Sequence, residues 1–311
     1  MKHLTILICS HNRAELLEKV IHSLNTAQHP KTWAVDILVV ANACTDNTHV
    51  FLDKYRSRQS EQDCLPLEYF AEPTPGKSHA LNAAIPRLMA SDVIAFVDDD
   101  HRVDTRYIEQ ICKAADEHPD ATIFCGRILP DWDGDEPAWV HDLGPYAVYP
   151  LPVPRYDLGL APRPINHNGP LPGGGNLALR TGVFERIGNF STQLGPTGHD
   201  LGGGEDSDFM FRAINAGERL QYIPDILQHH YVDLERLKLS YLMRKSYQRS
   251  RSVTQIHSQG SSAVPRHLWR KLSTYIWKTV TSLYWPATRF YLVRTAATLG
   301  ELSGFLSKSH H

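Results

Sequence analysis

Short apolar runs alternate with helix-patterned segments at the start of the chain, and this alternation limits the fold more than any other feature. The runs are Leu4–Cys9, Val35–Val40, Leu67–Phe70 and Val93–Val97. Each has the length of a strand buried on both faces of a sheet. The segments between them carry apolar residues at helical spacing. Strands that alternate with helices build βαβ units, so we expect an α/β fold with a mostly parallel sheet flanked by helices.

Polar loops follow three of these four expected strands. They are Ser10–Arg13, Asn42–Thr48 and the acidic triplet Asp98–Asp100. Ligands of α/β sheets bind beyond the carboxyl ends of the strands, so we expect the loops to meet at one crevice. Three adjacent carboxylates repel one another unless a positive group neutralises them. A divalent cation would do so, and the triplet predicts a metal site, although a solvated turn or helix cap has the same local pattern.

Two further segments carry groups with alternative roles. The pair Glu205-Asp206 follows a glycine cluster, Leu201–Gly204, and precedes a helix expected over Phe209–Ala216. A carboxylate there caps the helix or acts as a general base above a glycine floor that a ligand can approach closely. In the pair His229-His230, one imidazole can be a further metal ligand, and the alternative is a structural or solvent-facing pair.

Other motifs exclude some classes of protein. Gly76-Lys77-Ser78 matches only the end of a phosphate-binding loop, and prolines stand before it, so it does not predict an ATPase. Lys77 can still donate to a phosphate or to the acidic triplet. The five cysteines include no C-x-x-C pair, which favours reduced thiols in a cytosolic protein. No signal peptide pattern or long apolar run is present, so we expect a cytoplasmic protein with no span across a bilayer.

The charge of the chain is uneven. The net charge is -2, but residues 231–311 hold 13 Lys and Arg against three Asp and Glu. Residues 130–172, rich in Pro, Gly and aromatics, read as a long irregular lid or binding loop. In the basic region apolar residues recur at helical spacing from Leu268 to Leu283. Such helices lie on an anionic membrane surface, or pack on the rest of the protein and expose a basic side.

Six segments, in this order, resemble family 2 of the glycosyltransferases, the inverting group with the Rossmann-like GT-A fold of the nucleotide-diphospho-sugar transferase superfamily. The resemblance covers residues 4 to about 240. The matching segments are Ile6–Arg13, Val39–Thr48, Gly76–Asn82, Phe96–Asp100, Gly173–Arg180 and Gly203–Asp206. The resemblance implies a GT-A catalytic domain over 1–231, with a nucleotide-binding half over 1–100 and an acceptor half over 101–231. Residues 232–311 then form a C-terminal basic helical extension that can associate with a membrane.

The resemblance also implies roles for single residues. Asp206 matches the catalytic base, with Glu205 beside it. Asp100, Asp98 and His230 match ligands of Mn²⁺ or Mg²⁺. Residues that match the nucleotide-sugar site are Cys9, His11, Arg13, Asn42, Lys77, Asp98, Asp99, Gly174 and Asn176. Ala41 and Ala43-Cys44 depart from the family's pattern, which weakens the assignment of the nucleobase.

The implied activity is the transfer of one sugar from a nucleoside-diphosphate sugar, by expectation a UDP-sugar, to an acceptor hydroxyl with inversion. The Q-x-x-R-W motif of processive polysaccharide synthases is missing, which favours single additions to a glycan or lipid-linked acceptor in cell-surface glycan or polysaccharide assembly. Alternatives with the same fold are a retaining sugar transferase and a nucleotidyltransferase. A non-catalytic nucleotide-sugar-binding module is a further alternative, which the two acidic clusters disfavour. No nucleic acid partner is expected.

Overall fold

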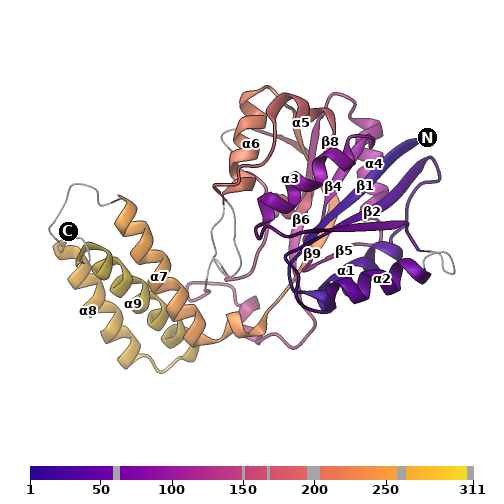
Figure 1. The fold of residues 1–311 in the computed structure, drawn as a ribbon. Helices are drawn as coiled ribbons and strands as arrows, with labels where there is room; N and C mark the ends of the chain where they lie inside the picture. Colours follow the sequence, from indigo (N-terminus) through magenta and orange to yellow (C-terminus); the bar gives the residue numbers. More distant parts are fainter. Residues whose placement is uncertain (59–63, 149–150, 167–168, 195–203, 258–263, 307–311) are drawn as a thin grey trace. The chain divides into compact units, whose positions relative to one another are not determined.

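The computed structural model describes residues 1–58, 64–148, 151–166, 169–194, 204–257 and 264–306. The chain divides into two compact units, which we describe separately (Figure 1). Unit 1 consists of Met1–Asp131 and Pro154–Tyr231, and unit 2 of Trp132–Val153 and Val232–His311. Residues 132–153, which the sequence analysis assigned to the catalytic region, thus group with the C-terminal helices.

Unit 1 is built on one mixed sheet, in the order β3-β2-β1-β4-β8-β6-β9-β5, with β7 paired to β9. The four strands predicted from the first apolar runs pair in parallel. Beyond β4 most pairings are antiparallel, which the sequence analysis did not predict. The strands are β1 (Lys2–Ser10), β2 (Trp33–Asn42), β3 (Leu67–Glu72), β4 (Val93–Phe96), β5 (His101–Val103), β6 (Ile123–Asp131), β7 (Arg163–Ile165), β8 (Leu177–Arg180) and β9 (Leu220–Tyr231).

Helices cover both faces of this sheet because successive strand residues point to opposite sides. Leu4, Ile6 and Ile8 of β1 join one apolar core, whereas Leu7 joins the other. The first core includes residues of α1 (Ala14–Asn25), α2 (Thr48–Arg58) and α4 (Tyr107–Glu117). The second includes residues of α3 (Lys77–Leu88), α5 (Gly182–Ile187) and α6 (Glu205–Asn215). The short helix η2 (Gly174–Asn176) leads into β8.

Unit 2 contains three long helices, α7 (Leu239–His257), α8 (Arg266–Thr281) and α9 (Trp285–Leu306), within its described residues. α9 packs against both α7 and α8. Its buried Arg289 donates to Asp142 Oδ2 over 2.7 Å, which ties the segment 132–153 to this unit. Short helices η1 (Ala138–His141) and η3 (Leu234–Leu237) complete it. Among the described residues, no helix is long and apolar enough to cross a membrane.

Candidate active site

The acidic triplet lies just beyond β4, and Lys77 contacts its first member. The distance from Lys77 Nζ to Asp98 Oδ1 is 2.8 Å. Lys77 opens α3, so the helix that follows β3 carries its ammonium to the end of β4. Burial alone would raise the pKa of Asp98, but the charge and hydrogen bond of Lys77, together with the nearby His101 and His230, outweigh it and the pKa is lowered. Asp98 is therefore ionised at neutral pH, and the predicted contact between Lys77 and the triplet is present.

Arg13 neutralises the other two carboxylates of the triplet. Its Nη1 atom lies 2.8 Å from Asp99 Oδ1 and 2.9 Å from Asp100 Oδ2. The triplet was interpreted as needing a metal cation to offset its charge, yet Arg13 and Lys77 already supply part of that offset. The reason is the parallel pairing of β1 with β4, which brings the loop after β1 alongside the triplet. Asp99 is buried, so it anchors Arg13 within the protein.

Two histidines flank Asp100 from neighbouring strands. β5 pairs with β9 in antiparallel register, and His101 lies opposite His230. His101 Nε2 is 3.9 Å from Asp100 Oδ1, and His230 Nε2 is 3.6 Å from Asp100 Oδ2. One ligand atom from each of the three residues lies within 4.8 Å of the others. His101 was not among the predicted metal ligands, because a strand of three residues leaves no periodic pattern to reveal its partner.

The hydrogen bonds of both imidazoles leave Nε2 available as a ligand atom. His230 Nδ1 lies 2.5 Å from the carbonyl oxygen of Tyr231, which only accepts, so Nδ1 carries the proton. His101 Nδ1 contacts the side-chain oxygen of Gln228. The amide nitrogen of Gln228 donates elsewhere in the core, which leaves that oxygen as the acceptor. Burial also lowers the pKa of His230, which favours the neutral ring that metals bind.

The group Asp100, His101 and His230 therefore fits a divalent cation. Both Nε2 atoms stand too far from the Asp100 oxygens for a good hydrogen bond. Both Nε2 atoms and the carboxylate can present lone pairs to the space between them, and a cation would satisfy all three. Asp98, which was also predicted to bind the metal, is not in this group and instead pairs with Lys77.

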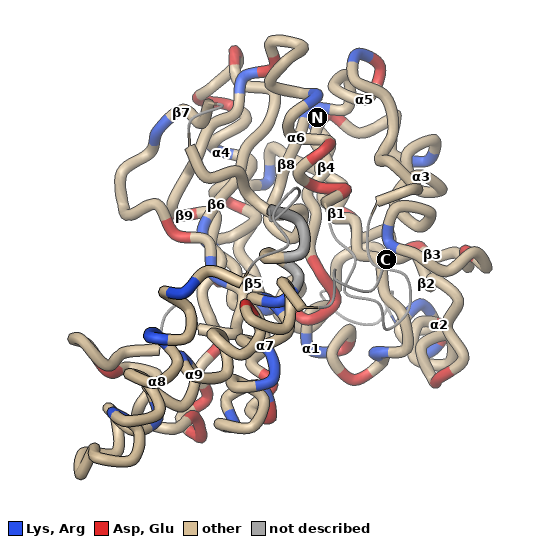
Figure 2. Tube along the Cα trace, turned by 90° about the vertical axis from the view of Figure 1, so that its left-hand side faces the viewer, with Lys and Arg blue, Asp and Glu red and all other residues tan. Residues whose placement is uncertain are grey.

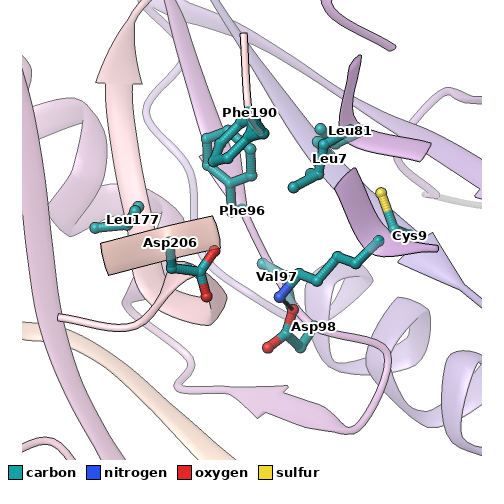
Figure 3. A pocket seen from close by; sticks show the side chains of 11 residues that line it. Leu7, Cys9, Leu81, Phe96, Val97, Asp98, Leu177, Phe190 and Asp206 are labelled. Carbon is teal, nitrogen blue, oxygen red and sulfur yellow. Dashed lines mark hydrogen bonds and ion pairs between the residues drawn. The ribbon is translucent and has the colours of Figure 1, made fainter. Parts of the chain in front are cut away.

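Two glycines bring Asp98 and Asp206 to one small cavity. A Cβ atom on Gly174 would lie 2.2 Å from Asp206 Oδ1, and one on Gly175 would lie 2.4 Å from Asp98 Oδ2. Both carboxylates and Lys77 line a cavity of about 10 Å³, shown in Figure 3. Asp206 Oδ1 is buried, and no group in the described part of the chain bonds it. A buried carboxylate oxygen without a partner costs stability, which is typical of sites that a ligand completes.

A larger cleft of about 440 Å³ shares three lining residues, Cys9, Lys77 and Asp98, with this small cavity. The three polar loops predicted to share a crevice all line the cleft. Asp206 lines the small cavity and Asp100 lines the larger cleft, and the two adjoin at these shared residues. Predicted site residues that line the cleft are Cys9, His11, Arg13, Asn42, Lys77, Asp98, Asp99, Asp100 and His230.

Asn42 shapes one edge of the cleft. Its Oδ1 accepts from the Gly76 amide over 2.8 Å, and its Nδ2 donates to the Thr74 carbonyl over 2.6 Å. The side chain is thus engaged by the protein, and recognition of the nucleobase by Asn42 stays a prediction. His11 Nδ1 donates to the Asn42 carbonyl over 2.7 Å, which holds its ring at the cleft. Burial raises the pKa of Cys9 to about 12, so this residue lines the cleft as a thiol.

Three other predicted residues line neither the cleft nor the small cavity. Asn176 is buried, donates to backbone oxygens of β6 and β9 and accepts from Gln228. Glu205 contacts the Gly204 amide at 3.1 Å, and burial raises its pKa. His229 pairs with Arg102 across the β5–β9 ladder and is not part of the candidate metal group. Residues 201–203 of the predicted glycine floor lie outside the described residues.

The start of α6 differs from the prediction. The helix begins at Glu205 and not at Phe209, because the acidic pair itself forms the first turn. Asp206 is consequently a helical residue, and the helix sets the direction of its side chain. Carboxylates in a first turn interact favourably with the helix dipole. The two readings of this pair, helix terminus and reactive carboxylate, are therefore compatible in the structure.

Replacing Gly175 with Ala should disrupt the site. The added Cβ would lie 2.4 Å from Asp98 Oδ2 and 2.8 Å from His101 Cε1, so one of these groups must move. We expect a destabilisation of about 1–3 kcal/mol, the usual cost of overpacking, and weaker donor binding. Gly173→Ala is the matched control, since its Cβ meets nothing within 4 Å. Thermal unfolding and calorimetric titration measure both effects, and equal behaviour of the two variants would contradict the assigned packing.

The chain matches the model of a family described as glycosyl transferase family 2 over residues 5–188. A curated relative is the glucosyl-dolichyl phosphate glucuronosyltransferase of Haloferax volcanii, 24% identical over 161 residues. The match covers 51% of this chain and 49% of that relative, so the chain spans about half of its length.

Solved structures share the fold. S. aureus TarS 1-349 in complex with UDP-GlcNAc has a TM-score of 0.55 at 16% identity, covering 96% of this chain and 90% of that one. The mannosyltransferase PcManGT of Pyrobaculum calidifontis, in complex with GDP-Man and Mn²⁺, has a TM-score of 0.54 at 14% identity, with 99% and 87% covered. Since the family model spans more than half of the residues, from the first strand to α5, the chain belongs to family 2 of the glycosyltransferases and has the GT-A fold.

Proposed function

We propose that this glycosyltransferase moves one sugar from a nucleoside-diphosphate sugar to an acceptor hydroxyl with inversion at the anomeric carbon. The observation that carries the proposal is the approach of Asp98 and Asp206 to one cavity across Gly174 and Gly175. The cavity adjoins a cleft of about 440 Å³, a size typical of small-molecule sites. Donor and acceptor would thus meet between a cationic pair of side chains and an unpaired carboxylate.

Each residue has a distinct task in this proposal. Asp206 takes the proton of the acceptor hydroxyl as that oxygen attacks the anomeric carbon from the face opposite the diphosphate. Lys77, whose pKa is raised well above its ordinary value because Asp98 and Asp206 outweigh its burial, stays protonated beside them. Arg13 is the second fixed cation at the cleft. Both cations favour binding of an anionic donor.

Asp100, His101 and His230 would hold the divalent cation. When bound, that cation would neutralise charge on the departing diphosphate. The imidazole nitrogens favour Mn²⁺ over Mg²⁺, because Mg²⁺ prefers an all-oxygen shell. PcManGT, whose structure contains Mn²⁺, supports this choice.

The donor is proposed to be a UDP-sugar, since TarS structures contain UDP and UDP-GlcNAc. PcManGT with GDP-Man is the counterexample, so the nucleobase is the first property to test. The acceptor is proposed to be a glycan or a lipid-linked sugar of the cell surface, presented at the inner face of the membrane. The dolichyl phosphate substrate named for the Haloferax volcanii relative supports a lipid-linked acceptor.

A thermal-shift screen of nucleotide sugars tests the proposal directly. We expect Mn²⁺ together with one nucleoside-diphosphate sugar to raise Tm, because a ligand that binds only the folded state stabilises it. UDP-sugars and GDP-sugars carrying the same hexose separate the two nucleobases. NMR of the product then gives the anomeric configuration, and a retained configuration would overturn the inverting mechanism. No stabilisation by any nucleotide sugar with Mn²⁺ would overturn the transferase proposal itself.

A further inference from the structure

α8 and the turn after it expose a stripe of large apolar side chains. Exposed fractions within this stripe run from 47% for Ile276 to 104% for Leu283. On α8, Trp269, Ile276 and Val280 recur at helical spacing and share one side of the helix. We call the following set the α8 stripe: Trp269, Ile276, Trp277, Val280, Leu283, Tyr284 and Trp285.

Apart from Tyr284, whose ring centre lies 6.1 Å from that of Tyr146, the stripe is not the side of α8 that packs within unit 2. Leu268 is buried, and Lys271 Nζ lies 2.8 Å from Glu301 Oε1 of α9. Lys278 Nζ lies 5.2 Å from the centre of the Tyr291 ring, also on α9. These three residues define the side of α8 that packs within unit 2, and the apolar residues of the stripe on α8 lie on another side of the helix. Contiguous apolar surface on a protein marks a site of interaction with a protein or a membrane.

The charges around the stripe favour an anionic partner. Residues 231–311 carry 13 Lys and Arg against three Asp and Glu, and the segment 132–153 adds four Asp and Glu, so unit 2 keeps an excess of basic residues. Lys and Arg positions recur along its helices (Figure 2). Arg266 and Arg270 are exposed on α8 itself. Within the described residues of α8 there is no acidic side chain. A protein partner buries mostly neutral surface at the centre of an interface, whereas an anionic bilayer attracts basic residues around an inserted apolar face.

We propose that the α8 stripe binds the surface of an anionic phospholipid bilayer. The aromatic composition of the stripe matches that environment, because Trp and Tyr concentrate at the boundary between headgroups and acyl chains. No described helix spans a membrane, so α8 lies in the plane of the interface with its basic residues among the headgroups. The inference rests on the proposed function in one respect: the enzyme would meet its lipid-linked acceptor at this membrane surface.

Co-sedimentation of the full chain with vesicles tests the proposal. The probes are phosphatidylcholine vesicles and vesicles in which one quarter of the lipid is phosphatidylglycerol. We expect binding to the anionic vesicles, with weaker binding at high salt. The double variant Trp277→Ser, Val280→Ser should lower the partition coefficient by roughly tenfold or more, since each side chain removed from the bilayer loses its transfer free energy.

The matched control is Val50→Ser, Leu160→Ser, which removes two side chains of comparable exposure from unit 1. It should bind vesicles as the unchanged protein does. Equal binding by the stripe variant, or no binding to anionic vesicles, would overturn the proposal. So would a dimer that the stripe variant abolishes, because a second copy would then cover the stripe. Donor-induced thermal shifts in the same variants should be unchanged, so failure at the membrane and failure of the transferase are distinguishable.

Discussion

Asp206→Asn should lower the turnover number by about 10²–10⁴-fold while donor affinity changes little, the usual result of removing a positioned base. Asn keeps the volume of the side chain beside Gly174, where the carboxylate and the glycine backbone are in close contact. The amide cannot accept the proton of the acceptor hydroxyl. Steady-state kinetics with saturating donor, together with calorimetric donor binding, separate the two quantities.

Asp208→Asn is the matched control for this experiment. Asp208 belongs to the same first turn of α6, but its carboxylate pairs with Arg212 at 2.9 Å and does not line the cavity beside Gly174. Both substitutions remove one negative charge near the helix N-terminus, a loss of about 0.3–1 kcal/mol. A large fall in turnover for Asp206→Asn alone supports a base. Near-normal turnover in that variant would remove Asp206 from the mechanism.

Asp100→Ala should weaken Mn²⁺ binding by more than about 100-fold, beyond the range seen when a residue that supports a ligand is removed. The substitution deletes the one carboxylate of the group that His101 and His230 complete. Arg13 keeps its contact with Asp99 at 2.8 Å, so the loop after β1 should stay in place. Electron paramagnetic resonance of free Mn²⁺ measures the affinity without reference to activity.

Two further variants make the metal prediction specific. His101→Ala should also weaken Mn²⁺ binding, and this result distinguishes the observed group from a site formed by the acidic triplet alone. Asp120→Ala removes an exposed carboxylate that pairs with Arg219 at 3.1 Å and should leave Mn²⁺ affinity unchanged. Undiminished Mn²⁺ binding in Asp100→Ala would show that the cation is held elsewhere. Donor binding with and without Mn²⁺ then shows whether the donor depends on the metal.

The local pattern of apolar residues was sufficient to predict the strands of the first half of the sheet. The apolar runs predicted β1 to β4 within a few residues of their bounds, because each buried strand has its own uninterrupted hydrophobic signal. The polar ends of these strands were likewise correctly expected to share a crevice. The sequence pattern of the strands in the second half of the sheet is weaker. β5 and β7 have three residues each, too few to show a period, and neither was predicted.

The sequence by itself determined the family, the parallel start of the sheet and the acidic groups available for chemistry, because these depend on residue type and short-range spacing. Only the tertiary structure decided which of those groups meet. His101 and its partner Gln228 are 127 residues apart, and antiparallel pairing of two strands brings them together. Arg13 contacts Asp100, and Asp206 lies close to the backbone of Gly174. The segments that carry these residues are far apart in the sequence, so no local hydrophobic pattern predicts the contacts. Contacts of this kind depend on how complete elements pack, which is why the motifs indicated Asp100 and His230 as candidate metal ligands but not His101, which the coordinates place beside them.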